Sequence, residues 1–433
     1  MNTARPVLQI REWSTTTPDH PTDGALLRGL QLTPADRELL DEIGKVSSLK
    51  ITELRDGISV AVAQHVGTLT LSGVRIVVLP KIRIDNLMRM VFYAFDLSDL
   101  ALSSTPSTYE ASKHGLVDLL GISLLHSVER IARGGLLAVY QSRSDDLPSP
   151  RGRIDIRHAA THPRQATLRC TYHELTTDHL LNQVIGAGLR LAANVMQNVD
   201  LRLDLARSAD RLCGDLERIT LDNDVLRRAQ EQLDRRSSHY KTALHLIALI
   251  YAGSRLGEHA SAGSMPLSGF MLNMNTVFER FLERYLKSVA PDDIQVVGQD
   301  VRSDVFQYLE RPKAWRHPTI RPDLLFKRRS EPFAIGDAKY KSRNDHAPST
   351  AELYQLTTYG LSYPMPEPRE VMLLHPLGTG ESDKRTVLRF APGSASQEVL
   401  IRLVGVPIDD ILEGKLERWW PLSEITQQAA VVA

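Results

Sequence analysis

Alternating β-branched and polar residues dominate the chain from Ile51 to Ile84, where Gly57, Gly67 and Gly73 interrupt the alternation. Short alternating runs divided by glycine are typical of antiparallel strands joined by tight turns. Immediately upstream, the segment LTPADRELLDEIGK at 32–45 opens with a Thr-Pro helix-start signal, and its apolar residues then recur at helical spacing. The pattern therefore predicts a small helix followed by several short antiparallel strands.

Helical periodicity characterises the middle of the chain. Apolar residues recur with a helical period across 87–137, 178–198 and 222–254. The segment 142–166 is instead rich in Pro, Ser, Arg and Asp, a composition expected of a connecting loop, with one short strand at 153–156. The sequence thus predicts a helix-rich middle region interrupted by a polar connection.

The last third of the chain changes to a mixture of strands and helices. Its expected elements are a helix at 273–288, strands at 321–326, 333–338 and 371–375, and a helix near 351–361. Helices interleaved with apolar strands are typical of an α/β domain whose mixed sheet is flanked by helices.

Length and composition indicate a protein of several domains. The chain has 433 residues, of which 42% are hydrophobic and 24% charged, so it has enough apolar material for more than one core. We therefore expect a multi-domain α/β protein with an N-terminal β-rich region at 1–100, a helix-rich middle domain at 101–262 and a C-terminal domain at 263–433.

Charge and cysteine content narrow the classes of function. The 52 basic and 52 acidic residues cancel, so contact with nucleic acid has to come from a local cluster rather than from net charge. Cys170 and Cys213 lie far apart without a CxxC spacing, which argues against a disulfide scaffold or a structural zinc site. The N-terminal residues do not read as a signal peptide, and no stretch is apolar enough to span a membrane. These features predict a cytoplasmic protein.

Two acids and a lysine in the last third are the strongest candidates for chemistry. Asp323 stands in RPDLLF, and Asp337 follows 14 residues later in FAIGDAKY, a spacing that suits two neighbouring strands joined by the turn KRRSEP. Because side chains alternate along a strand, Asp337 and Lys339 are expected on one face. Phosphodiester hydrolysis needs carboxylates that hold a divalent cation, and a lysine that positions water or neutralises phosphate charge would assist it. The same Asp-x-Lys triplet is also common as an exposed ion pair.

Three further residues bear on that choice. Glu279 lies beside apolar positions of its predicted helix, so its carboxylate either reaches the interior or occupies an ordinary helix boundary. Gln355 and Tyr359 are four residues apart on the next predicted helix and share one face. Their polar groups suit contact with phosphate or bound water, but an interior pair that satisfies the backbone gives the same pattern.

In chain order these residues resemble a known active-site pattern. The pattern has an acid on a helix, two strand motifs and a pair on a second helix: Glu279, Pro322-Asp323, Asp337-x-Lys339 and Gln355-x-x-x-Tyr359. It is similar to that of the PD-(D/E)xK nuclease superfamily, in the branch with a Q-x-x-x-Y element. The segments HVGTLTLSG, LPKI, RGRIDI and YHELTTDHLLNQVI further resemble the McrC family, the nuclease subunits of McrBC 5-methylcytosine restriction systems. This resemblance extends from about Gln64 to His375.

The resemblance implies a metal-dependent DNA endonuclease with a C-terminal PD-(D/E)xK domain. Asp323, Asp337 and Glu279 would ligate Mg²⁺, for which Mn²⁺ would substitute, while the lysine and the Gln-Tyr pair would complete the catalytic set. It also implies a partner, an AAA+ GTPase of the McrB type that moves DNA, docked on the N-terminal β-rich region within a hetero-oligomer. The absence of a Walker A motif from this sequence agrees with such a partner.

Two other functions are compatible with the same residues: a catalytically silent scaffold that activates an AAA+ partner, and a stand-alone DNA repair nuclease. The intact set of Asp323, Asp337 and Lys339 argues against the scaffold, because a decayed site is expected to lose one of them. A repair nuclease would need no motor.

Two polar clusters lie outside this pattern. The first consists of arginines: Arg151, Arg153, Arg157, Arg164 and Arg169. These suit a DNA backbone, but Arg153 and Asp155 alternate with Ile154 and Ile156, which favours a salt-bridged, solvated strand face for 151–157. The second, His173-Glu174 with Asp178 and His179, lacks the HExxH spacing, and a helix N-terminus explains it better than a metal site.

Overall fold

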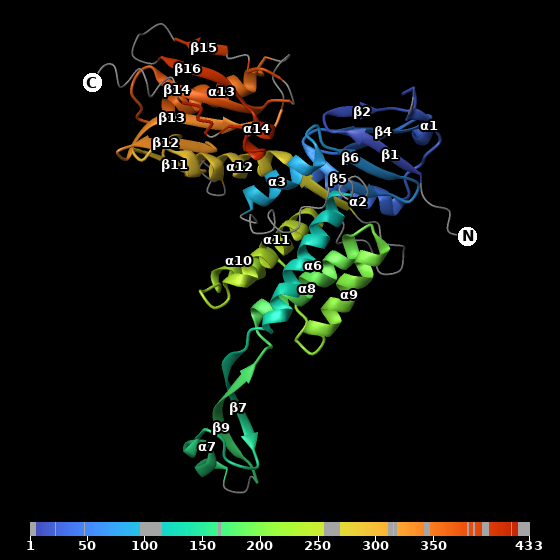
Figure 1. The fold of residues 1–433 in the computed structure, drawn as a ribbon, viewed down its shortest axis with the longest axis vertical. Coiled ribbons are helices and arrows are strands. Elements are labelled where there is room, and N and C mark those ends of the chain that lie inside the picture. Colours follow the sequence, from blue (N-terminus) through green and yellow to red (C-terminus); the bar gives the residue numbers. More distant parts are fainter. Residues whose placement is uncertain are drawn as a thin grey trace. The chain divides into compact units, whose positions relative to one another are not determined.

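The computed structural model (Figure 1) describes residues 6–21, 23–46, 48–95, 115–162, 166–254, 269–310, 315, 318–341, 347–378, 381–383, 386–391, 398–416 and 418–422. The chain falls into two compact units. The first comprises Met1–Thr108, His259–Leu267 and Met271–Ala433, and the second comprises Tyr109–Glu258 and Ser268–Phe270. The acids and the lysine singled out above belong to the first unit.

Short strands build the N-terminal part of the first unit. They are β1 Val7–Arg11, β2 Ser14–Thr16, β3 Lys50–Leu54, β4 Gly57–Val62, β5 His65–Thr70 and β6 Arg75–Leu79. β3 pairs with β4 and β5 with β6, in both cases antiparallel, which confirms the antiparallel strands predicted for 51–84. β1 lies parallel to β6 and is an additional strand that the alternation does not predict.

Three helices accompany these strands: α1 Gly24–Leu27, α2 Pro34–Val46 and α3 Ile84–Ala94. α2 confirms the helix predicted at 32–45. Its first turn is fastened by Asp36, whose carboxylate accepts hydrogen bonds from the backbone N–H groups of Thr33 and Ser72, each at 2.9 Å. The helix start is thereby tied to the turn between β5 and β6.

A mixed sheet forms the C-terminal part of the first unit. Its strands are β11 Ile294–Gly298, β12 Leu324–Arg328, β13 Glu331–Ala338, β14 Arg369–Pro376, β15 Thr386–Phe390 and β16 Val399–Val406. The strand order over the described residues is β11-β12-β13-β14-β16-β15, with β13, β14 and β16 parallel and the outer strands antiparallel. The strands predicted near 321–326, 333–338 and 371–375 correspond to β12, β13 and β14, which confirms a mixed α/β architecture.

Helices α12 Met274–Val289, α13 Thr350–Ser362 and α14 Ile408–Leu412 accompany this sheet. α13 connects the parallel strands β13 and β14, and a capping box between Ser349 and Glu352 fixes its start. Its side chains Leu356 and Tyr359 are buried in the core that lies on the sheet. Gly360 allows this close approach, because an added Cβ would stand 2.8 Å from a Val399 methyl group.

Hydrogen bonds join the N-terminal strands to the C-terminal α/β part within the first unit. The N–H of Met274, at the start of α12, donates to the carbonyl of Gln64 at 2.8 Å. The Asn86 amide on α3 donates to the Asp409 carboxylate on α14 at 2.6 Å. Residues from 1–100 and from 263–433 therefore share one compact unit.

The second unit is mainly helical. Its longer helices are α6 Leu116–Gly134, α8 Leu180–Val195, α9 Val199–Cys213, α10 Asn223–Glu231 and α11 Lys241–Ser254. α6, α8, α10 and α11 confirm the helical periodicity read over 115–137, 178–198 and 222–254, whereas α9 is an additional helix. Residues 96–114 of the stretch predicted at 87–137 lie outside the described residues. Cys170 and Cys213 in this unit are both buried and free. Over the described residues of both units, no helix has the length and apolarity that a membrane crossing requires.

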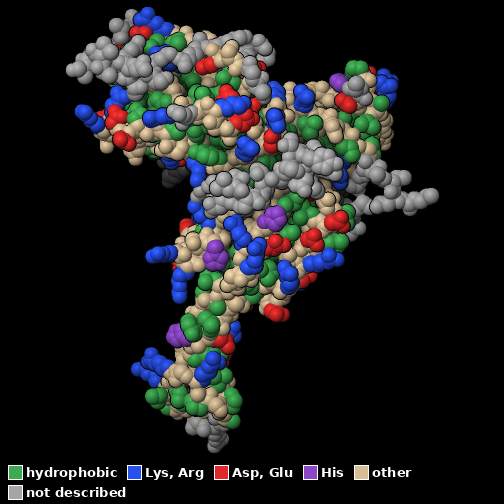
Figure 2. All heavy atoms as spheres, viewed as in Figure 1, with side chains coloured by type: hydrophobic (Ala, Val, Ile, Leu, Met, Phe, Trp, Pro, Cys, Tyr) green, Lys and Arg blue, Asp and Glu red, His purple; other side chains and the backbone are tan. Residues whose placement is uncertain are grey.

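A long hairpin extends from the helices of the second unit (Figure 1). Its strands are β7 Val139–Leu147, β8 Arg153–Ile154 and β9 Leu168–Thr176, with the short helix α7 Ile156–Thr161 between them. The prediction of a loop over 142–166 is therefore wrong for residues 142–147, which pair along β9. Most side chains on both faces of β7 are exposed. Polar residues are therefore as compatible with this strand as with a loop. Figure 2 shows basic and apolar side chains side by side on this hairpin.

Candidate active site

The hairpin formed by β12 and β13 places the two predicted acids opposite one another. Antiparallel pairing ends with Leu324 against Gly336, and Asp323 and Asp337 are the residues adjacent to this last pair on the side away from the turn. The turn passes through two residues of positive φ, a conformation typical of tight hairpin connections. The pair of neighbouring strands predicted from the 14-residue spacing is confirmed.

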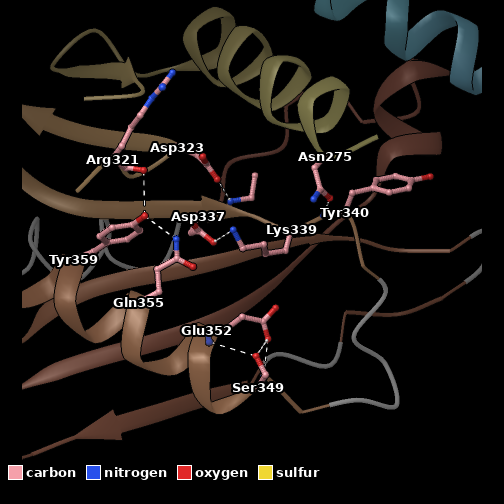
Figure 3. Close-up of polar contacts among 11 residues, drawn as sticks. Asn275, Arg321, Asp323, Asp337, Lys339, Tyr340, Ser349, Glu352, Gln355 and Tyr359 are labelled. Carbon is pink, nitrogen blue, oxygen red and sulfur yellow. Dashed lines mark hydrogen bonds and ion pairs between the residues drawn. The ribbon is translucent and has the colours of Figure 1, made fainter. Parts of the chain in front are cut away.

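Asp323 is held against the neighbouring strand by its own carboxylate. Its Oδ2 accepts a hydrogen bond from the backbone N–H of Ala338 at 2.8 Å, and its carbonyl accepts one from the N–H of Gln299 at 2.9 Å. Figure 3 shows the Asp323 and Asp337 side chains close together at the site. The Ala338 bond fixes the Asp323 carboxylate beside the residue that follows Asp337.

Asp337 and Lys339 form the centre of the site. Asp337 is 1% exposed, and its Oδ2 lies 2.9 Å from the Lys339 ammonium, whose side chain is 27% exposed. The backbone N–H of Lys339 donates to the carbonyl of Leu374 at 2.9 Å, so the residue is fixed just beyond the end of β13. The two side chains point toward one another (Figure 3), which confirms their predicted common face. The pair is buried on the acid side and reaches solvent on the lysine side.

Gln355 and Tyr359 on α13 contact each other and the strand that leads to Asp323. The Gln355 amide donates to the Tyr359 hydroxyl at 2.7 Å, and that hydroxyl donates to the carbonyl of Arg321 at 3.1 Å. Figure 3 shows both side chains directed from the helix toward the site. The sequence left two roles open for this pair: contact with phosphate or water, or hydrogen bonding to the backbone. The contacts observed are of the second kind. Tyr359 thereby holds the backbone two residues before Asp323.

Glu279 on α12 shares the electrostatic environment of this site. It is partly buried, and burial raises the pKa of its carboxyl, an effect that Lys339 opposes and Asp337 reinforces. The same helix approaches the site at its start, where the Asn275 side-chain oxygen accepts a hydrogen bond from the N–H of Tyr340 at 3.2 Å. The charges of Asp337 and Lys339 therefore both influence the Glu279 carboxyl.

Burial and crowding of acids shape the electrostatics of the site. Burial, together with the neighbouring Asp337 and Glu279 carboxylates, raises the pKa of Asp323 to about 7. Burial also raises the pKa of Asp337, although the Lys339 ammonium opposes that shift. For Lys339 burial alone would lower the pKa of the ammonium, but the Asp337 carboxylate outweighs burial and raises it. The net rise at both acids shows that one ammonium does not offset their burial and crowding.

The chemical capacity of the site follows from this donor set. Among the described residues, no three His, Cys, Asp or Glu side chains are placed closely enough to form a complete metal-binding group. Asp323 and Asp337 nevertheless offer hard oxygen donors whose mutual repulsion a divalent cation would relieve. A cation such as Mg²⁺ needs no more than one or two carboxylates when waters and a phosphate complete its shell. The residues therefore fit a magnesium-dependent phosphate chemistry.

The raised pKa of Asp323 leads to a prediction about stability without metal. A carboxyl whose pKa is higher in the folded state favours folding when it is protonated, and this contribution is lost as the pH rises from about 4 through about 7. Asp323→Asn cannot ionise and keeps an acceptor for Ala338. In a chelator, the thermal unfolding midpoint of the variant relative to the parent chain should therefore rise between pH 5 and pH 8.

Asp36→Asn is the control, because ionisation of Asp36 should stabilise the fold, whereas ionisation of Asp323 should destabilise it. Burial works to raise the pKa of Asp36, but hydrogen bonds from Ser72 and Thr33 outweigh it and lower the pKa. Its carboxylate therefore stabilises the fold at neutral pH and loses that contribution in acid. A constant difference between Asp323→Asn and the parent chain across this pH range would contradict the assignment for Asp323.

The other sequence clusters have contacts of their own. Arg169 pairs with Asp146 at 2.9 Å, and Arg151 lies 3.9 Å from Glu174, as the salt-bridged interpretation predicts. Asp155 instead caps α7. Arg153 and Arg157 are exposed, and Arg164 lies outside the described residues.

The second cluster is used at the start of α8. Asp178 accepts hydrogen bonds from Gln183 and from the N–H of Glu217, and His179 contacts the carbonyl of Leu137 at 2.9 Å. Glu174 is paired with arginine on the adjacent strand. A helix does begin here, at Leu180, but the prediction of acids in its first turn is wrong, because His173 and Glu174 lie on β9 and Asp178 precedes the helix.

Two residues near the site escape the sequence patterns. Asn275 lies at the start of α12, and Tyr340 directly follows Lys339. The adjacency of Tyr340 to the lysine is the signal that would have singled it out. Nothing local marks Asn275, because its role depends on a contact with residue 340.

Comparisons with known proteins extend these observations. The family described as McrBC 5-methylcytosine restriction system component matches residues 60–376. Among solved structures, a chain from a half-complex of the tetradecameric assembly of Thermococcus gammatolerans McrB AAA+ hexamers with bound McrC is 19% identical, with a TM-score of 0.54. That alignment covers 95% of this chain and 99% of the other. A chain of the Thermococcus gammatolerans McrBC complex is 18% identical with a TM-score of 0.43, covering 65% and 87%. No curated protein matches the chain.

The fold and the site define a multi-domain α/β protein with two opposed acids and a lysine at one end of a mixed sheet. The match over 60–376 spans most of the sequence, so the chain belongs to the McrBC 5-methylcytosine restriction system component family. The similarity to the first archaeal structure adds a shared fold. The resemblance to McrBC components inferred from the sequence segments is thereby confirmed.

Proposed function

We propose that this chain is the DNA-cleaving subunit of a modification-dependent restriction system, a PD-(D/E)xK endonuclease that requires Mg²⁺ and an AAA+ GTPase partner. The observation that carries the proposal is the placement of Asp323 opposite Asp337, with Lys339 ion-paired beside them. Pro322-Asp323 and Asp337-x-Lys339 supply the motif, and the family membership supplies the system. The recognised modification is 5-methylcytosine, read within the assembly.

Asp323 and Asp337 are the residues that would hold Mg²⁺, or Mn²⁺ in its place, with Glu279 as a third acid at greater distance. When bound, the cation would stabilise negative charge on the scissile phosphate and favour ionisation of a nearby water. The Ala338 hydrogen bond keeps the Asp323 carboxylate turned toward Asp337 for this purpose. The proposal thus assigns Asp323 and Asp337 to one ligand sphere that water and phosphate complete. The ligand role that the sequence resemblance implied for Glu279 is not met, because no three acids of the described residues lie close enough to share a cation.

Lys339 has the role of positioning the attacking water and neutralising phosphate charge. Its ammonium is partly exposed while its partner Asp337 is buried, so it is the component of the pair that an incoming phosphate meets. Gln355 and Tyr359 support the site by holding the Arg321 carbonyl, which fixes the approach of the chain to Asp323. Their role in the proposal is to position the metal-binding strand.

The partner in this proposal is a GTPase of the McrB type. This sequence has no Walker A motif of its own, and the archaeal structure with the same fold contains McrB AAA+ hexamers with bound McrC. The proposed counterpart of this chain is McrC, in a cytoplasmic hetero-oligomer. The N-terminal β-rich region of 1–100 is the proposed docking part, 101–262 the middle domain, and 263–433 the nuclease domain.

The test is cleavage of methylated plasmid DNA by the purified chain, with and without Mg²⁺ and with and without a candidate GTPase plus GTP. Linear product is expected only when the chain, Mg²⁺ and the GTPase with GTP are all present. Cleavage that needs no GTPase would support a stand-alone repair nuclease instead. Stimulated GTP hydrolysis without any cleavage would support the catalytically silent scaffold.

A further inference from the structure

The residue directly after the proposed catalytic lysine is tied to the N-terminal strand region. The Tyr340 ring is buried and points away from Asp337 (Figure 3), and its hydroxyl donates to Glu12 Oε1 at 3.1 Å. Glu12 lies one residue beyond β1 and is 1% exposed. The two residues are 328 positions apart in the chain, so this contact exists only in the assembled unit.

Burial of the Glu12 carboxylate should destabilise the fold. Its Oε1 also accepts the backbone N–H of Lys81 at 2.6 Å, whereas its Oε2 is buried and has no hydrogen-bond partner among the residues that the structure describes. Burial raises the pKa of Glu12 to about 7, which reflects the cost of ionising it there. An aliphatic side chain would pack without that cost, so stability alone gives a poor account of Glu12.

The contact between Glu12 and Tyr340 constrains the backbone next to Lys339. Three contacts hold Tyr340 in place. Its hydroxyl donates to Glu12, and its backbone N–H donates to Asn275 on α12 at 3.2 Å. Its ring packs against Phe278, with the ring centroids 5.9 Å apart. The next residue, Lys341, lies over the Trp13 ring at 5.4 Å. The backbone on the C-terminal side of Lys339 is therefore fixed by residues 12 and 13.

We propose that Glu12 is a positioning residue of the nuclease site: by holding the Tyr340 hydroxyl it keeps Lys339 in place beside Asp337. The inference rests on the proposed nuclease function. It makes the first strand of the chain part of the active site, and it gives a docked partner on the N-terminal region a physical path to the chemistry. Displacement of β1 would release Tyr340 and loosen the lysine.

The test compares two tyrosines that lose the same kind of bond. Tyr340→Phe removes only the hydroxyl that reaches Glu12. Tyr93→Phe removes a hydroxyl that contacts Ser288 at 3.0 Å, a hydrogen bond that also joins the N-terminal part to the C-terminal α/β part, here at α12. Single-turnover cleavage with saturating partner and Mg²⁺, the KM for DNA, and hydrogen exchange of the peptide spanning 338–341 are measured for both full-length variants.

Tyr340→Phe should slow cleavage about ten- to hundredfold with KM for DNA within about twofold, because misplacement of a catalytic group affects the rate more than binding. It should also speed exchange at 338–341, and Tyr93→Phe should do neither. Equal effects of the two variants, or unchanged exchange after Tyr340→Phe, would overturn the inference. If the parent chain cuts no DNA, the proposed function fails, and the exchange comparison still decides whether Glu12 positions this segment.

A double-mutant cycle tests whether Glu12 acts through Tyr340. Glu12→Ala should slow cleavage to the same degree as Tyr340→Phe, and the double variant should be no slower than either one, because both changes remove a single interaction. Losses that multiply would show that Glu12 acts by another route and would overturn the proposal. Should Glu12→Ala fail to fold, the tyrosine comparison retains the full test.

Discussion

Asp337→Asn is expected to lower the rate of DNA cleavage by roughly a thousandfold or more while the chain stays folded, a loss of the size found when a preorganised charge-stabilising group is removed. Asp337 is buried between Asp323 and Lys339, and the variant retains its volume but not its charge. Calorimetric titration should show weakened binding of Mg²⁺ or Mn²⁺. Because burial raises the pKa of Asp337, loss of its ionised form should leave the metal-free unfolding midpoint unchanged or slightly higher.

Glu370→Gln is the matched control in the same sheet. Glu370 is 8% exposed and binds Arg402 through both oxygens at 2.8 and 3.0 Å, remote from the paired acids along β14. Its loss leaves a partly buried arginine without its carboxylate, so this variant should unfold at a lower temperature yet still cut DNA. The two variants therefore have opposite signatures. If Asp337→Asn cuts DNA at the parent rate, Asp337 is not a metal ligand.

The local part of the site was predictable because short-range rules govern it. A turn of a few polar residues between two apolar runs almost requires a hairpin, and the period of two then sets Asp337 and Lys339 on one face. The final register does not follow from the turn alone, because a bulge between Phe326 and Lys327 shifts the pairing by one residue. Without that shift Asp323 would lie opposite Gly336 rather than Asp337. Helix α13 was predictable for the same reason, since Gln355 and Tyr359 are related by one helical turn.

The long hairpin of the second unit was missed for a physical reason. Its strand β7 contains SRSDDL, whose residues are exposed on both faces and carry no apolar alternation. Such a ribbon is held by its cross-strand backbone pairing and by pairs such as Arg169 with Asp146, neither of which leaves a hydrophobic pattern in the sequence. Composition alone then reads as a loop.

Contacts between distant segments were equally invisible. Nothing in the sequence pattern singles out Glu12, whose contacts in the fold are with Tyr340 and Lys81. The same holds for Asn275, whose side chain serves a backbone group of residue 340. Hydrophobic periodicity shows which side of a segment is buried. It does not show which distant residue a polar side chain will contact, and the roles of Glu12 and Asn275 depend on such contacts.

Lys339→Met is expected to lower the cleavage rate by roughly a hundred- to a thousandfold while binding of Mg²⁺ is retained. The methionine side chain fills the same space but offers no ammonium to neutralise charge on the phosphate. Because the ammonium is not a ligand and its loss removes a positive charge next to Asp337, the affinity for a divalent cation should be unchanged or higher. Rates are measured under single-turnover conditions, and metal binding is measured by calorimetry.

Lys327→Met is the control for Lys339→Met, because Lys327 lies on the adjacent strand β12, beyond the turn-side end of the paired acids. It should keep both the rate and the affinity for metal. The contrast separates the lysine from the acid beside it, since Asp337→Asn loses cleavage together with metal binding, whereas Lys339→Met loses cleavage alone. Were Lys339→Met to abolish metal binding as well, the lysine would have a structural role in holding the acids, and its assignment to the attacking water and the phosphate would have to be withdrawn.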